Sequence, residues 1–170
     1  MAIRGIFFYL DRAHLLQTSQ PSIHDSTITL FRTHVFNDAA LQSKVIDGAC
    51  DLLLSERLGQ SLDPVLFKSA VKFMHDIAVY TVYLEPRMVS LSQDFISAWA
   101  ARECTANELP EYVRKCFDLI DVEVKRCDTF DLDSTTRRAL LTLLEFHLIE
   151  EREAVLSTSR QQPKLLGFTC

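Results

Sequence analysis

The sequence predicts an all-α protein, and three observations support that prediction. Apolar residues recur at the three- and four-residue spacing that places them on one face of a helix. Only four Gly and five Pro occur in 170 residues, and the internal ones mostly fall between these apolar segments. The one strand-like run, residues 79–84, is rich in β-branched and aromatic residues but has no candidate partner strand. We therefore expect an elongated array of about seven helices, with 79–84 forming a helix end, a connection and the next helix start.

The first predicted helix, over residues 5–16, is apolar on more than one side. Successive residues turn by about 100° around a helix axis, so two faces can be distinguished. The stripe that we expect to be buried in a core contains Ile3, Ile6, Phe7, Leu10 and His14. The second face contains Phe8, Tyr9, Arg12 and Leu16. Because Tyr and Arg are favoured anchors of protein interfaces, this second face is a candidate binding surface. The alternative is that it packs against neighbouring elements of the same chain.

Capping signals delimit the next two helices. After Pro21 breaks the first helix, Ser22 and Asp25 form a capping-box pattern, which predicts a helix over 22–36. The following helix is expected to run on to Gly59. Glycine is a natural C-terminal cap, because it adopts the left-handed backbone conformation without steric penalty.

The remaining helices begin at capping residues or at prolines. Their expected starts are Asp63-Pro64, Pro86, Pro110 and Asp133-Ser134. The helix that contains Pro86 is expected to end near Arg102, with Trp99 as a core anchor. The last helix is expected to reach Leu148, with Leu156 as its furthest extent. The tail from Ser157 has the composition of a frayed or disordered end.

Composition and charge argue against several classes of protein. The net charge of -5 argues against a nucleic-acid binder. No apolar run approaches the ~20 residues that span a bilayer, and no signal-peptide cleavage site is present. The number of cysteines is odd, and no two form a C-x-x-C pair; they are Cys50, Cys104, Cys116, Cys127 and Cys170. We therefore expect reduced, core-filling thiols of a cytosolic or nuclear protein, without a disulfide framework or a zinc site.

No residues form a recognisable reaction centre. His24-Asp25 and His75-Asp76 are adjacent pairs, whose side chains point about 100° apart on a helix. His147 and Glu150 have the one-turn spacing of metal ligands in some helix bundles, but the second pair that such a site needs is missing. Phosphate-binding, dinucleotide-binding and nucleophile-elbow motifs are absent. We therefore predict no catalytic residue, no metal and no cofactor, and the sequence favours binding or scaffolding.

Several short stretches resemble the cullin family, the elongated scaffolds of ubiquitin ligases. These stretches are Phe8-Tyr9-Leu10-Asp11-Arg12, Leu30-Phe31-Arg32-Thr33-His34, Gln42-Ser43-Lys44-Val45-Ile46-Asp47-Gly48, Ser55-Glu56-Arg57-Leu58-Gly59, Leu109-Pro110-Glu111-Tyr112 and Leu132-Asp133-Ser134-Thr135. They are loose singly, but they keep their order and spacing over about nine tenths of the chain. The residues in these stretches are most similar to those of the type-four cullins, the branch that uses a β-propeller adaptor.

The resemblance implies a fold, a function and a binding face. Cullin N-terminal regions are tandem five-helix repeats, so 1–20 would be the last helix of a truncated first repeat, 21–156 the following repeat, and 157–170 a frayed or non-native tail. The implied function is a non-catalytic stalk segment of a cullin-RING E3 ubiquitin ligase, acting in ubiquitin-dependent degradation in cytoplasm and nucleus. The family's adaptor-contacting positions match Tyr9 and Arg12, and Phe8 and Leu16 share their face.

The resemblance also implies what lies outside this sequence. In cullins a RING-box protein binds a C-terminal half, and a second adaptor-contacting helix precedes the first one here. We therefore expect a fragment, a truncated gene model or a short paralogue, with exposed apolar surface on the first helix and weak adaptor binding by this chain alone. The alternative function is a self-contained helical interaction domain of the TPR or HEAT kind. A 34- or 40-residue repeat would support that alternative, and none is found.

Overall fold

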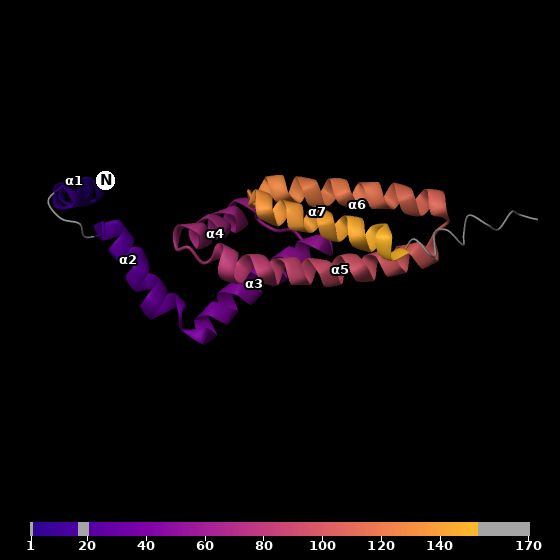
Figure 1. Ribbon diagram of the computed structural model, residues 1–170, viewed down its shortest axis with the longest axis horizontal. Coiled ribbons are helices and arrows are strands. Elements are labelled where there is room, and N and C mark those ends of the chain that lie inside the picture. The colour runs from indigo at the N-terminus through magenta and orange to yellow at the C-terminus, as the bar shows by residue number, and fades with distance from the viewer. Residues whose placement is uncertain (1, 17–20, 153–170) are drawn as a thin grey trace, which may run out of the picture. The chain divides into compact units, whose positions relative to one another are not determined.

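The computed structural model describes residues 2–16 and 21–152, apart from the side chains of residues 2–4 and 14. Within these residues the backbone forms seven α-helices, two π-helical segments, one 3-10 segment and no strand (Figure 1). The helices are α1 (Ala2–Leu15), α2 (Ile23–Phe31), α3 (Ala39–Arg57), α4 (Pro64–Asp76), α5 (Glu85–Ala106), α6 (Leu109–Phe130) and α7 (Ser134–Leu148). The short segments are η1 (Arg32–Phe36), η2 (Tyr80–Leu84) and η3 (Glu150–Arg152). The all-α prediction is confirmed.

The chain divides into two compact units. One contains Met1–Leu62 and Lys72–Leu84, and the other contains Asp63–Val71 and Glu85–Cys170. Helix α4 is shared between them, since its residues up to Val71 belong to the second unit. The predicted repeat boundary after residue 20 stays a prediction, because 17–20 lie outside the described residues.

Two of the predicted N-terminal caps, Ser22 and Asp63, make capping hydrogen bonds, whereas Asp133 precedes α7 without a side-chain capping bond. Ser22 Oγ accepts a hydrogen bond from the backbone N–H of Asp25 at 2.9 Å, as the capping-box pattern predicts. Asp63 Oδ1 accepts from the backbone N–H of Val65 at 2.9 Å, directly before α4. These bonds satisfy donors that a helix start leaves without intrahelical partners. Helix α2 continues into η1, so the predicted helix over 22–36 is confirmed with its last turn widened to π geometry.

Three helices end in a Schellman motif, in which a residue with positive φ closes the last turn. This residue is Gly59 after α3 (φ 87°), Ala78 after α4 (φ 55°) and Asp131 after α6 (φ 57°). Each donates its N–H to the carbonyl three residues earlier, at N···O distances of 2.9, 2.9 and 3.4 Å. Of these three helix ends, only the one at Gly59 was predicted, because glycine is the residue that usually adopts positive φ after a helix.

The strand-like run 79–84 forms the π-helical segment η2 and the residue before it, with Val79, Tyr80 and Leu84 buried and residues 81–83 exposed. The ring of Tyr80 stacks on that of His75 with centroids 4.0 Å apart. The expectation of a connection between two helices is confirmed. Val79 and Tyr80 are buried without a partner strand, because tertiary packing overrides a local strand preference.

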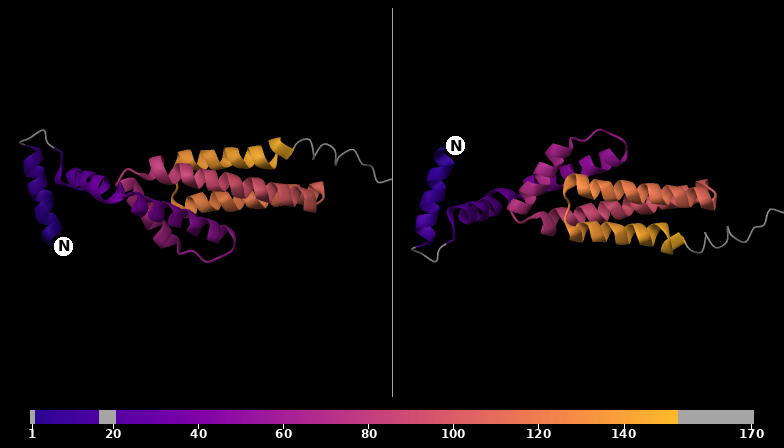
Figure 2. Two further views of the ribbon diagram at one scale, coloured as in Figure 1. Left: turned by 90° about the horizontal axis from the view of Figure 1, so that it is seen from below. Right: turned by 90° about the horizontal axis from the view of Figure 1, so that it is seen from above.

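In the second unit α5, α6 and α7 lie alongside one another, as both sets of views show (Figures 1 and 2). Their common core contains the buried residues Ile96, Ala100, Tyr112, Cys116, Leu144 and Leu148. Trp99 packs against this core, as predicted. The Tyr112 hydroxyl donates a hydrogen bond to the backbone carbonyl of Leu148 at 2.8 Å, which joins α6 to the end of α7.

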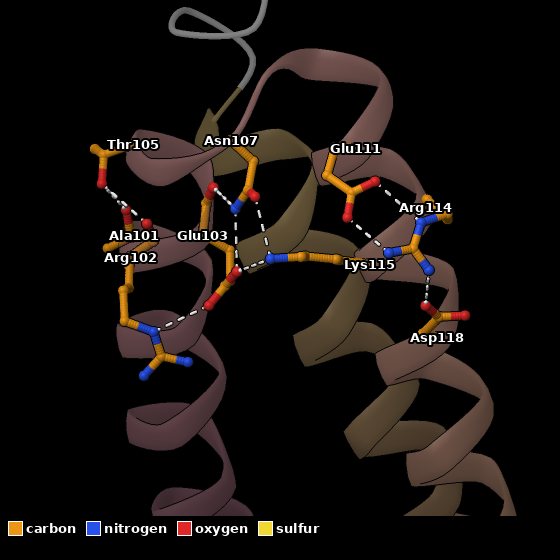
Figure 3. A network of polar contacts seen from close by, with 9 residues as sticks. All are labelled: Ala101, Arg102, Glu103, Thr105, Asn107, Glu111, Arg114, Lys115 and Asp118. Atoms are coloured by element: carbon orange, nitrogen blue, oxygen red, sulfur yellow. Dashed lines mark hydrogen bonds and ion pairs between the residues drawn. The ribbon is translucent and has the colours of Figure 1, made fainter.

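A polar network holds the turn between α5 and α6 (Figure 3). Lys115 Nζ donates to Glu103 Oε2 at 2.8 Å and to Asn107 Oδ1 at 3.1 Å. Helix α5 reaches Ala106, beyond the predicted end near Arg102. The reason is that the polar side chains there bond back into the helix: Asn107 Nδ2 donates to the Glu103 carbonyl at 2.8 Å.

The described cysteines form no disulfide with one another. Cys50, Cys116 and Cys127 are buried, and Cys104 is half-buried. Burial raises the pKa of the Cys116 and Cys127 thiols. The prediction of core-filling thiols is confirmed for the three buried ones, whereas Cys170 lies outside the described residues.

Helix α6 also buries a charged pair. The Arg126 guanidinium donates to the Glu123 carboxylate, and both side chains are at least nine-tenths buried. Buried charges are tolerated when they are paired. The sequence did not indicate this pair, since Glu and Arg on a helix are usually exposed.

Candidate functional site

The predicted binding face lies on the surface of α1. Tyr9 and Leu16 are 75% and 81% exposed, and Phe8 and Arg12 are exposed as well. These four side chains therefore do not pack into a core of this chain, which was the alternative reading of the second face. The backbone N–H of Leu16 donates to the Arg12 carbonyl at 3.2 Å. Leu16 therefore continues the last turn of α1, the helix that contains Phe8, Tyr9 and Arg12.

The other stripe of α1 is also exposed, which corrects the expectation that it is buried. Ile6, Phe7 and Leu10 are half exposed or more. The side chains of Ile3 and His14 lie outside the described residues. The physical reason is that α1 meets the start of α2 at one side only, and that contact covers little of its circumference.

A hydrogen bond joins α1 to α2. Asp11 Oδ1 accepts from the backbone N–H of Ile23 at 2.7 Å. This N–H belongs to the first residue of α2, where backbone donors lack intrahelical partners and the helix dipole favours an anion. Ser22 satisfies another donor of the first turn, the N–H of Asp25, and hydrogen bonding by Ser22 lowers the pKa of the Asp25 carboxyl. Asp11 thus fixes where α2 begins against α1.

An open pocket of about 210 Å³ lies at this junction, lined by Phe7, Phe8, Asp11, Ile23 and His24. Its volume is below the roughly 300–1,000 Å³ of typical small-molecule sites. It therefore suits a single apolar side chain of another protein. Of the four predicted residues only Phe8 lines it, so Tyr9, Arg12 and Leu16 form an adjacent area of α1.

Sequence reasoning identified Phe8 but missed the rest of the pocket. Asp11 belongs to neither of the two predicted faces of α1, and Ile23 and His24 belong to the next predicted helix. Their proximity to α1 depends on the path of residues 17–20, which no local pattern specifies. The capping signal at Ser22 gave the start of α2 but not its direction.

The described residues form no cluster of metal ligands. They contain no group of three or more His, Cys, Asp or Glu that could hold a metal ion. His147 Nδ1 lies 2.8 Å from Glu151 Oε2, so its partner is not Glu150, the residue that the one-turn spacing had indicated. No helix in the described ranges is long and apolar enough to cross a bilayer. What α1 offers is an aromatic ring, a guanidinium group and aliphatic surface, which are the groups of a protein interface.

Comparison with known proteins identifies relatives that match almost the whole length of this chain. The family model described as the cullin alpha solenoid domain matches residues 1–166. The chain is 35% identical to Cullin-4A of Homo sapiens over 150 residues, which cover 88% of this chain and 20% of that protein. It is 28% identical to Cullin-4 of Dictyostelium discoideum over 156 residues, with 91% and 19% covered. It is 25% identical to Cullin-3B of Arabidopsis thaliana over 149 residues, with 86% and 20% covered. The chain thus spans about one fifth of the length of these relatives.

Proposed function

This chain belongs to the cullin family, and we propose that it is a non-catalytic scaffold segment of a cullin-RING E3 ubiquitin ligase. In this role its helices form a rigid stalk that holds a substrate adaptor away from the RING-binding end. Stacked helical repeats suit such a task, because each contacts its neighbours and the array resists bending. The complex would act in ubiquitin-dependent degradation, in cytoplasm and nucleus.

The proposed adaptor-binding surface is the face of Tyr9, Arg12, Phe8 and Leu16. The observation that carries the proposal is the exposure of Tyr9 and Arg12 one turn apart on α1. A tyrosine ring supplies contact area at low entropic cost, and an arginine supplies oriented hydrogen bonds. The pocket beside Phe8 would receive an apolar side chain of the same partner. Similarity to Cullin-4A favours an adaptor of the β-propeller type.

A RING-box protein is the second proposed partner of the complex. It would bind a part of the scaffold that corresponds to the region of the relatives beyond the matched fifth. Residues 1–170 would then contribute to ligase activity through distance and rigidity alone, with no reaction centre of their own.

Fluorine NMR of the four tyrosines tests the adaptor face. The chain contains Tyr9, Tyr80, Tyr83 and Tyr112, of which Tyr80 and Tyr112 are buried. With 3-fluorotyrosine at all four positions, addition of a β-propeller adaptor should shift the Tyr9 resonance. The buried Tyr80 and Tyr112 serve as internal references. Fast exchange makes weak binding visible, which matters because α1 alone offers a small area.

Two variants make the experiment decisive. Arg12→Gln should abolish the Tyr9 shift, whereas Lys125→Gln removes the same charge from an exposed position on α6 and should leave the shift unchanged. A Tyr9 resonance that does not move at adaptor concentrations near 1 mM would rule out this face, since 1 mM corresponds to only about −4 kcal/mol of binding. An equal shift in Arg12→Gln and the native chain would rule out the anchor role of Arg12.

A further inference from the structure

A second concave surface lies in the other unit, between α5 and α7. This groove has a volume of about 460 Å³ and is lined by Val89, Thr135, Arg138, Ala139, Thr142 and Leu143. The two helices that form it lie side by side in Figures 1 and 2. The five α7 residues are spaced i, i+3, i+4, i+7 and i+8, so they share one face of that helix. The groove is thus built from regular, rigid elements.

The floor of the groove is apolar and its rim is polar. Val89, Ala139 and Leu143 are half-buried, and Leu143 also packs against the core of the unit. Thr135 and Thr142 are exposed at the rim. An apolar floor with a few placed polar groups is the usual composition of a site that binds a peptide or ligand.

The charged groups beside the groove are engaged, with one exception. Arg137 Nη1 lies 2.5 Å from Asp128 Oδ1. Glu85 Oε1 accepts hydrogen bonds from the hydroxyls of Thr135 at 3.1 Å and Thr136 at 2.7 Å. Arg138 is exposed and makes no ion pair or hydrogen bond with another described residue. Within the described residues the rim therefore presents one cation without an ion-pair partner, on a chain whose net charge is -5.

We propose that this groove binds a short acidic segment of a partner protein. An apolar side chain of the segment lies on Val89, Ala139 and Leu143, and a carboxylate pairs with Arg138. A guanidinium group matches a carboxylate with two parallel hydrogen bonds, which gives both energy and orientation. A single cation with Glu85 nearby does not make the extended basic patch that nucleic acids or anionic lipids need. The proposal is independent of the adaptor face on α1.

Selection from a displayed library of random 12-residue peptides tests the groove directly. The native chain and Ala139→Glu serve as parallel baits, because a glutamate at 139 fills the groove and offsets the positive charge of Arg138. Far-UV circular dichroism and thermal melting verify that the variant folds. Peptides enriched on the native chain should carry an apolar residue within four positions of Asp or Glu and be lost on Ala139→Glu. The proposal is overturned if no peptide distinguishes the two baits, or if the enriched peptides are basic.

Fluorescence polarisation with the most enriched peptide then tests the ion pair. Arg138→Gln should weaken binding about five-fold or more, and replacing the peptide's acidic residue by its amide should have the same effect. Combined, the two changes should weaken binding no further than either alone, since they remove one shared interaction. The control Lys125→Gln removes the same charge from α6 and should change affinity less than two-fold. Equal losses in Arg138→Gln and Lys125→Gln would mean non-specific charge attraction and would refute the site.

Discussion

Lys115 on α6 and Glu103 on α5 form an ion pair across the turn that joins the two helices, with Nζ and Oε2 2.8 Å apart (Figure 3). The Glu103 side chain is only 14% exposed. It is also hydrogen-bonded by Asn107 and by Arg102. Lys115 above all lowers the pKa of Glu103 to about 2 from its ordinary 4.5. The pair is therefore better placed to stabilise the fold than ion pairs in open solvent.

Glu103→Gln should destabilise the second unit in a pH-dependent way. The lowered pKa means that the carboxylate contributes fully above the unfolded-state pKa, and that its contribution is lost as the pH falls through about 2. We expect a loss of about 1 kcal/mol in the free energy of unfolding at pH 7. Urea titrations at pH 7 and pH 3 measure it, and the gap between native and variant should narrow at pH 3. Glu111→Gln, which breaks an exposed pair with Arg114 within α6, is the control and should have a smaller effect. A gap that widens at low pH would contradict the assignment.

Ala78→Gly should stabilise the protein although it removes a side-chain atom. Ala78 closes α4 with φ 55°, where a Cβ is disfavoured by about 1 kcal/mol and glycine is not. Chemical denaturation should show a gain of about 0.5–1 kcal/mol. Ala98→Gly, at an exposed position within α5, should lose about as much, since glycine weakens a helix interior. Changes of the same sign in both variants would disprove the explanation.

Tyr112→Phe should weaken the contact between α6 and the end of α7. The substitution leaves the buried Leu148 carbonyl without its 2.8 Å hydrogen bond, which costs about 1–3 kcal/mol. Thermal and urea unfolding measure the loss. Tyr83→Phe, at a partly exposed tyrosine of η2, is the matched control and should be close to neutral. An unchanged stability of Tyr112→Phe would show that the hydroxyl contributes nothing.

Arg126→Met should be more harmful than the double change Glu123→Met and Arg126→Met. Removal of the guanidinium alone takes the ion pair from the buried Glu123 carboxylate, and breaking a buried pair costs about 3–5 kcal/mol. The double variant removes both charges and keeps the apolar volume, so part of the stability should return. Melting temperatures of the two variants compare them directly. A double variant less stable than Arg126→Met would contradict the explanation, because removal of the second charge should restore stability.

Local features of the fold were predictable from the sequence, and distant ones were not. Ser22 and Asp63 carry hydrogen bonds to residues two or three positions away, so their capping roles follow from sequence alone. Ala78 and Asp131 adopt positive φ although neither is the glycine that usually marks a helix C-terminus. The resemblance to a family was recognisable because the short motifs keep the family's order and spacing, although each motif alone is unspecific.

The candidate sites divide in the same way. The face of Tyr9 and Arg12 follows from helical periodicity, and its exposure agrees with a binding surface. Burial of the other α1 stripe was wrongly expected, because apolar character alone does not say what covers it. The groove beside Arg138 depends on how α5 packs against α7, which periodicity cannot give.

The exposed apolar side chains of α1 have a consequence for a newly synthesised copy of this chain that has no partner. Large apolar side chains exposed together are the surface that chaperones and quality-control proteases recognise. A partner that covers α1 would hide this surface from that surveillance. The residues proposed to bind a partner are thus the same ones that would mark an unassembled copy for removal.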